Sequence, residues 1–85
     1  MVNIEALYKK YDKEIKKLEG KISEDKNIIK ERENKIKEIK FSEEDETDYL
    51  YSLIDGIIFR EQRIKEEEQQ IHTLERKIYL LNAIK

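Results

Sequence analysis

Apolar residues recur along this chain at alternating spacings of four and three, the heptad repeat that places them on one face of an α-helix. The repeat holds for about five heptads in each of two stretches, residues 4–39 and residues 50–81. The chain has no proline and only two glycines, so nothing in its composition prevents long helices. The seam positions are Ile4, Tyr8, Tyr11, Ile15, Leu18, Ile22, Asp25, Ile29, Arg32, Ile36 and Ile39 in the first stretch, and Leu50, Leu53, Ile57, Arg60, Ile64, Glu67, Ile71, Leu74, Ile78 and Leu81 in the second. The pattern predicts two long helices that pack through one seam.

The segment between the two stretches, residues 41–48, is acidic and rich in Ser, Thr and Asp. Such residues start helices, because their side-chain oxygens accept hydrogen bonds from the free N–H groups of the first turn. We interpret it as the turn of a hairpin, with helix 1 over about residues 3–40 and helix 2 over about residues 49–84. Antiparallel pairing of residues whose numbers sum to 89, such as Ile15 with Leu74, gives every seam residue from Tyr8 to Leu81 a seam partner. The predicted fold is therefore all-α, a single domain (residues 1–85) formed by an antiparallel coiled-coil hairpin.

An unbroken helix is the alternative, because the heptad phase continues through the turn. Two such helices from different copies would make the same seam contacts in an antiparallel dimer. That dimer would place Glu43 of one copy against Glu46 of the other, twice, and like charges repel. A parallel dimer would stack each charged seam residue on itself, which is worse. The sequence favours the hairpin and leaves the rod open.

Composition sets limits on the class of protein. Charged residues make up 45% of the chain, but the net charge is only −2, unlike the strong basic excess of most nucleic-acid-binding proteins. Cysteine is absent, so disulfides and thiolate metal sites are excluded. No apolar run approaches the ~18 residues that span a bilayer, and no secretory signal pattern is visible. We expect a cytoplasmic protein without a membrane span. Its small size predicts a homodimer, formed as a four-helix bundle.

Charges interrupt the predicted seam near its middle. We call these four residues the charged seam: Asp25, Arg32, Arg60 and Glu67. Arg60 falls one layer from Asp25, within reach of a salt bridge. Charged seam residues commonly fix helix register and orientation, and the alternative is a polar surface that recognises a partner. No nucleophile or histidine accompanies the carboxylates, so we expect no catalytic residues, and the chain is not predicted to be an enzyme.

The second helix carries more apolar residues than its seam requires. The additional ones are Tyr49, Tyr51, Ile54, Ile58 and Phe59 near its start, and Tyr79, Leu80 and Ile84 near its end. A helix that is apolar on two sides packs on two sides, and the other helix of the hairpin covers only one. These residues are the candidate contacts with a second copy or with a different protein.

The first helix instead carries basic residues on its outer face. We call Lys9, Lys10, Lys13, Lys16 and Lys17 the lysine face. A row of lysines can contact the phosphates of a nucleic acid, although nearby acidic residues weaken its field and a solvated surface is the favoured interpretation. The acidic turn lacks the ligand spacing of a calcium loop, and no sequence motif for a metal or cofactor is present.

Together these features predict a non-enzymatic protein–protein interaction module. Such a chain would serve as a small coiled-coil regulator, inhibitor or assembly factor that self-associates, docks on a larger protein through helix 2, or does both. The alternative is a nucleic-acid-binding hairpin dimer that uses the lysine face.

Overall fold

Two long helices account for nearly all of the chain that the structure describes. The computed structural model describes residues 3–39 and 47–84. Helix α1 spans Ile4–Glu38 and helix α2 spans Thr47–Ile84, with 35 and 38 residues. The predicted all-α class is confirmed, and neither helix is long and apolar enough to cross a lipid bilayer.

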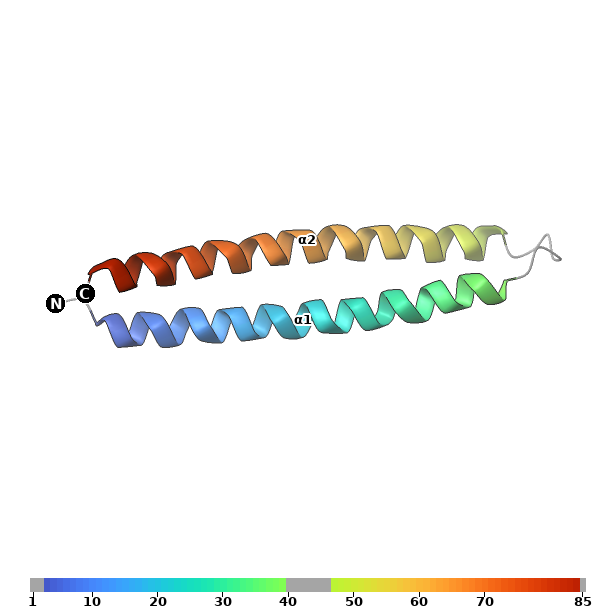
Figure 1. Cartoon of the computed structure of the whole chain (residues 1–85). Coiled ribbons are helices and arrows are strands. Elements are labelled where there is room, and N and C mark those ends of the chain that lie inside the picture. Colours follow the sequence, from blue (N-terminus) through green and yellow to red (C-terminus); the bar gives the residue numbers. More distant parts are fainter. Residues whose placement is uncertain (1–2, 40–46, 85) are drawn as a thin grey trace.

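The helices lie side by side and run in opposite directions, so the start of α1 and the end of α2 are at the same end of the molecule (Figure 1). This arrangement confirms the hairpin and contradicts the unbroken rod. Most of the predicted turn, residues 41–46, lies outside the described residues. Thr47 and Asp48, which the sequence assigned to that turn, instead form the start of α2. The acidic side chain of Asp48 suits this place, because the first turn of a helix carries partial positive charge.

Local interactions explain where α1 begins and ends. The side-chain oxygen of Asn3 accepts a hydrogen bond of 3.1 Å from the backbone N–H of Ala6, which caps the first turn. At the other end, the backbone N–H of Ile39 donates to the carbonyl oxygens of Lys35 and Ile36. Lys35 and Lys37 lie in this last turn, where their positive charges complement the negative end of the helix dipole.

The predicted seam forms the interface between the helices. Every seam residue of the described ranges is buried or half-buried. Ile22, Ile29 and Ile64 make the central cluster, and Ile57 and Ile71 pack against it. Isoleucines at these positions mesh with the opposite helix at coiled-coil spacing, so burial of the seam accounts for the hairpin.

Polar contacts between the helices follow the predicted register. The pairs are Tyr8 with Asn82, Tyr11 with Lys77, and Asp25 with both Arg60 and Arg63. Their residue numbers sum to between 85 and 90, close to the predicted 89. Counting heptads was therefore sufficient to align the two helices along their length.

The hairpin is a thin rod with a single layer of packing. Its principal extents are 67 × 15 × 14 Å, and its radius of gyration is 19.3 Å, against about 12 Å for a compact domain of this length. Its accessible surface is 7251 Å², against about 5,400 Å² for a compact monomer of this mass. Even the five buried apolar side chains of the core each keep 7–8% of their surface exposed. One layer of helix packing leaves much of this chain in contact with solvent.

Candidate functional site

The exposed large apolar side chains of the described residues all belong to α2. They are Tyr49, Tyr51, Ile54, Ile58, Phe59, Tyr79, Leu80 and Ile84, with exposed fractions from 39% to 70%. This is the same set that the sequence nominated as candidate contacts. None of these side chains belongs to the seam through which α2 packs on α1.

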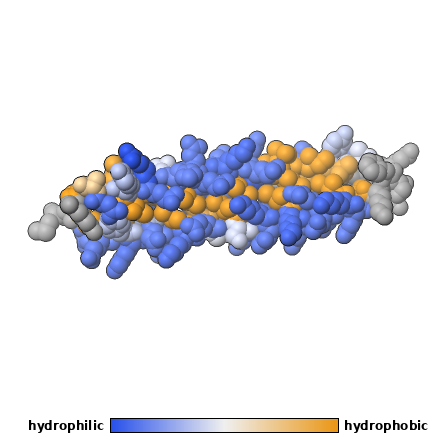
Figure 2. Space-filling view, in the orientation of Figure 1, coloured by the Kyte–Doolittle hydropathy of each residue, from blue (hydrophilic) through white to orange (hydrophobic). Residues whose placement is uncertain are grey.

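Three of these residues form one continuous row, which we call the tip stripe: Tyr51, Ile54 and Ile58. Their spacings of three and four place them on one side of α2, in its half nearest the turn. Their exposed fractions are 61%, 39% and 50%. Figure 2 shows the apolar surface as a narrow band along the middle of the rod that widens toward the turn end. The tip stripe is the longest run of exposed large apolar residues at helical spacing on α2.

The other exposed apolar residues of α2 do not extend this row. Successive residues of an α-helix are rotated by about 100°, so Phe59 lies on the other flank of α2 from the tip stripe. Its ring lies under the guanidinium of Arg63, 5.7 Å from ring centroid to Cζ. Tyr79 similarly contacts Arg76, at 5.1 Å. Cations already cover part of these two rings, which separates them from the tip stripe.

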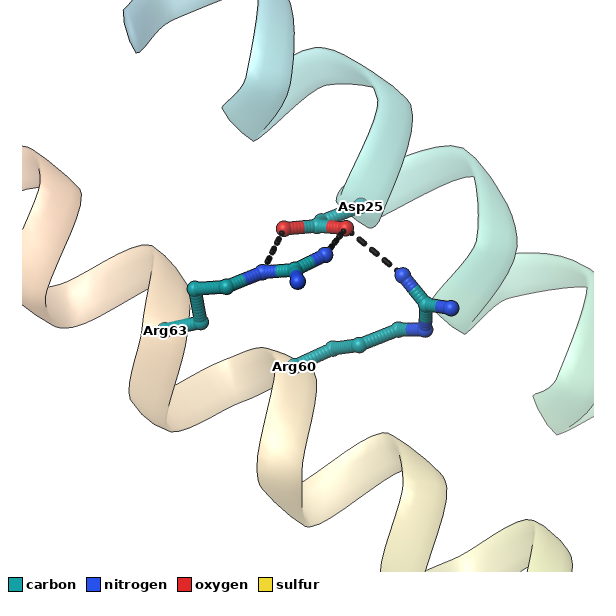
Figure 3. A network of polar contacts seen from close by, with 3 residues as sticks. All are labelled: Asp25, Arg60 and Arg63. Atoms are coloured by element: carbon teal, nitrogen blue, oxygen red, sulfur yellow. Dashed lines mark hydrogen bonds and ion pairs between the residues drawn. The ribbon is translucent and has the colours of Figure 1, made fainter.

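Asp25 is the centre of the charged contacts between the helices. Its side chain comes from the seam of α1 and is only 3% exposed. Arg60 donates to its Oδ1 at 2.7 Å, and Arg63 donates to both carboxylate oxygens, with 2.9 Å to Oδ2 (Figure 3). Three charge-assisted hydrogen bonds compensate for removing this carboxylate from water.

The two arginines reach Asp25 from different positions on α2. Arg60 occupies the seam itself and keeps 22% of its side chain exposed, whereas Arg63 flanks the seam and keeps 45% exposed. The hydrogen bonds from Arg63 are the largest cause that lowers the pKa of Asp25, and desolvation opposes them. The same bonds raise the pKa of Arg63 above its already high value. The cluster therefore holds a charged aspartate between two cations at neutral pH.

The remaining two residues of the charged seam lie apart from these hydrogen bonds. Arg32 is half-buried, and its guanidinium lies against Gly56 of α2, where an added Cβ would overlap its Nη1. Glu67 is 6% exposed, and its Oε1 has no hydrogen-bond partner among the described residues. Its negative charge contributes to raising the pKa of Arg63. The structure thus connects two of the four predicted residues directly and places the other two separately.

Sequence reasoning missed Arg63, which makes two of the three hydrogen bonds to Asp25. The sequence offered only a partial signal, because position 63 flanks the seam one turn after Arg60. A long arginine side chain at such a position reaches across to the partner helix.

The lysine face is exposed on the outer side of α1. All five of its residues are exposed, and Lys16 forms an ion pair of 3.1 Å with Asp12, one turn earlier. Two shallow grooves run between the helices, with volumes of about 460 and 420 Å³. Lysine and glutamate side chains line both grooves, and Lys17 of the lysine face borders the larger one.

Within residues 3–39 and 47–84, no three His, Cys, Asp or Glu side chains gather as a metal site would require. Comparisons of the chain with known protein families, with curated proteins and with solved structures found no match. Function must therefore be argued from the surfaces themselves.

Proposed function

We propose that this chain is a non-enzymatic protein–protein interaction module whose contact surface is the exposed apolar side of α2. The observation that carries the proposal is the segregation of exposed apolar residues. All of the large ones in the described chain lie on α2, and three of them form the tip stripe. Apolar side chains arranged in a row at helical spacing are typical of a surface that packs on another helix.

The charged centre supports a role in holding this surface in place. Asp25, Arg60 and Arg63 connect α1 to α2 by hydrogen bonds that need one particular register. A fixed register keeps the tip stripe on a defined side of the rod. A module of this kind acts as a regulator, inhibitor or assembly factor, in which binding rather than chemistry is the function. Self-association would bring the helices of two copies together as a four-helix bundle.

The test is a double substitution in the tip stripe, Ile54→Lys with Ile58→Lys. Lysine is a good helix former, and neither residue belongs to the seam, so the hairpin should remain helical by circular dichroism. We expect the dissociation constant for binding, to itself or to a partner protein purified from the native host, to rise at least ~tenfold. The matched control replaces Lys9, Lys13, Lys16 and Lys17 with glutamine and should leave that binding unchanged.

The opposite pattern would support the nucleic-acid alternative. In that case the glutamine variant loses binding to RNA or DNA, and the affinity of the natural chain falls steeply with added salt. Binding that survives the tip-stripe substitution would overturn the proposed function.

A further inference from the structure

We propose that the tip stripe is covered by the tip stripe of a second copy of this chain, in a two-fold symmetric dimer joined at the turn ends of the hairpins. This inference rests on the proposed function and names its partner. In the dimer, α2 of one copy packs antiparallel on α2 of the other, with Ile54 next to the symmetry axis. The overlap covers roughly residues 47–61 of each copy, where four helices lie side by side.

The spacing of the stripe makes it complementary to itself. A two-fold interface requires that residue i contacts residue j and that j contacts i. Antiparallel pairing about Ile54 brings Tyr51 of each copy within one residue, or ~1.5 Å along the helix, of the level of Ile58 in the other, so apolar meets apolar at all three positions. The next residue pair on the same side is Thr47 with Glu61, which brings no like charges together.

Nearly full-length overlaps bring like charges together. On the same side of α2, the residues beyond the stripe include Glu61, Lys65, Glu68 and Glu75, all exposed. One nearly full-length register sets Lys65 against itself and brings Glu61 within one residue of the level of Glu68. The next register sets Glu61 against Glu75 and Glu68 against itself. Like charges placed directly opposite oppose association, so the charge pattern favours the short overlap at the turn end.

The hairpin exposes more surface than a compact chain of its mass, as expected of a chain that buries part of its surface against a partner. The chain exposes 7251 Å², about 1,900 Å² more than a compact monomer of its mass. A standard interface removes about 800 Å² from each partner. The far end of α2 offers no equivalent row, because Leu80 and Ile84 lie on the other flank from Tyr79. A self-complementary apolar row, present only near the turn, points to a second copy at that end.

Disulfide trapping tests the register, because the chain contains no cysteine of its own. In the proposed dimer, Ile54→Cys faces the same residue of the second copy, and mild oxidation should link the two within the distance a disulfide spans. The matched control is His72→Cys, an exposed position of α2 outside the overlap. We expect the Ile54→Cys chain to cross-link at least ~tenfold faster than the His72→Cys chain at equal concentration.

The shape of the dimer provides an independent measurement on the unmodified chain. With the two-fold axis at Ile54, each hairpin extends 30 residues, or ~45 Å, from the axis to the end of α2, so the dimer should be roughly 90 Å long by small-angle scattering. Side-by-side dimers would instead keep a length close to the 67 Å of one hairpin. A length near 67 Å, or faster cross-linking at position 72, overturns the turn-end dimer.

A chain that stays monomeric by light scattering at 100 µM or above also overturns this inference, yet the proposed function survives if a different protein binds the tip stripe. If the double variant Ile54→Lys with Ile58→Lys still forms dimers, this inference is also overturned. If that double variant also binds every partner protein as the natural chain does, the proposed function is overturned too.

Discussion

The two helices share one seam but differ on their outer surfaces. In α1, the large apolar residues are buried or half-buried, and the remaining positions are mostly charged or polar. In α2, the seam is equally regular, but eight further large apolar residues are exposed. The hairpin therefore accounts for the sequence of α1 and leaves part of α2 unexplained. That difference is the reason to place the contact surface on α2.

The largest expected effect tests whether the helices share the seam equally. Ile29→Ala in α1 and Ile64→Ala in α2 each remove a buried side chain of the central cluster. Each should lower the free energy of unfolding by about 2–4 kcal/mol, measured in urea by circular dichroism at one fixed protein concentration. Ile58→Ala, on the exposed side of α2, should cost less than about 1 kcal/mol in the monomer. A small effect at either buried isoleucine would contradict a seam supported from both sides.

The next effect concerns the charged contact that joins the two helices. Asp25→Asn removes the charge from three hydrogen bonds, and we expect the free energy of unfolding at pH 7 to fall by about 2 kcal/mol. The pKa of Asp25 is lowered in the folded chain, so this stabilisation is present above the unfolded value of about 3.9. It is lost as the pH falls through the lower folded pKa.

The natural chain and the Asp25→Asn variant should therefore become more alike in stability as the pH falls from about 5 to 2. Urea unfolding across this range measures the difference between them. A difference that stays constant with pH would mean that the charge of Asp25 contributes nothing specific.

Heptad counting predicted those features of the hairpin that depend only on the spacing of residues along a helix. The seam, the antiparallel register and the contact of Asp25 with Arg60 all follow from positions along a helix, and the structure shows each of them. The exposed apolar side of α2 was visible for the same reason. Periodicity is a property of the backbone, so a sequence is enough to reveal it.

Side-chain reach was beyond this reasoning. Arg63 flanks the seam, and only the length and direction of its side chain bring it to Asp25. Arg32 belongs to the seam by position, but its guanidinium lies against the bare backbone of Gly56 rather than on a carboxylate. Rotamers of long side chains depend on their neighbours on both helices, and spacing alone does not determine them. What the contact surface binds also lies beyond periodicity, because it depends on a second molecule.

A smaller change in stability is expected when the single glycine of each helix is replaced by alanine. An alanine Cβ at Gly20 of α1 would meet nothing within 4 Å, so Gly20→Ala should stabilise the chain by about 0.5–1 kcal/mol through helix propensity. At Gly56 of α2, the same Cβ would displace the guanidinium of Arg32. The gain from Gly56→Ala should therefore be smaller, as measured by thermal unfolding. Equal gains would show that Arg32 moves away without cost.

The smallest effect tests the outer face of α1. Lys16→Gln removes an ion pair with Asp12 that is exposed on both sides, with 74% and 59% of the two side chains accessible. Exposed pairs of this spacing contribute about 0.3–0.5 kcal/mol, and salt screens them. We expect the variant to lose that amount at low salt, to match the natural chain at 1 M salt, and to associate normally. An effect on association as large as that of the Ile54→Lys and Ile58→Lys pair would show that the outer face of α1 belongs to the contact surface, and the contrast between the two helices would no longer locate it on α2.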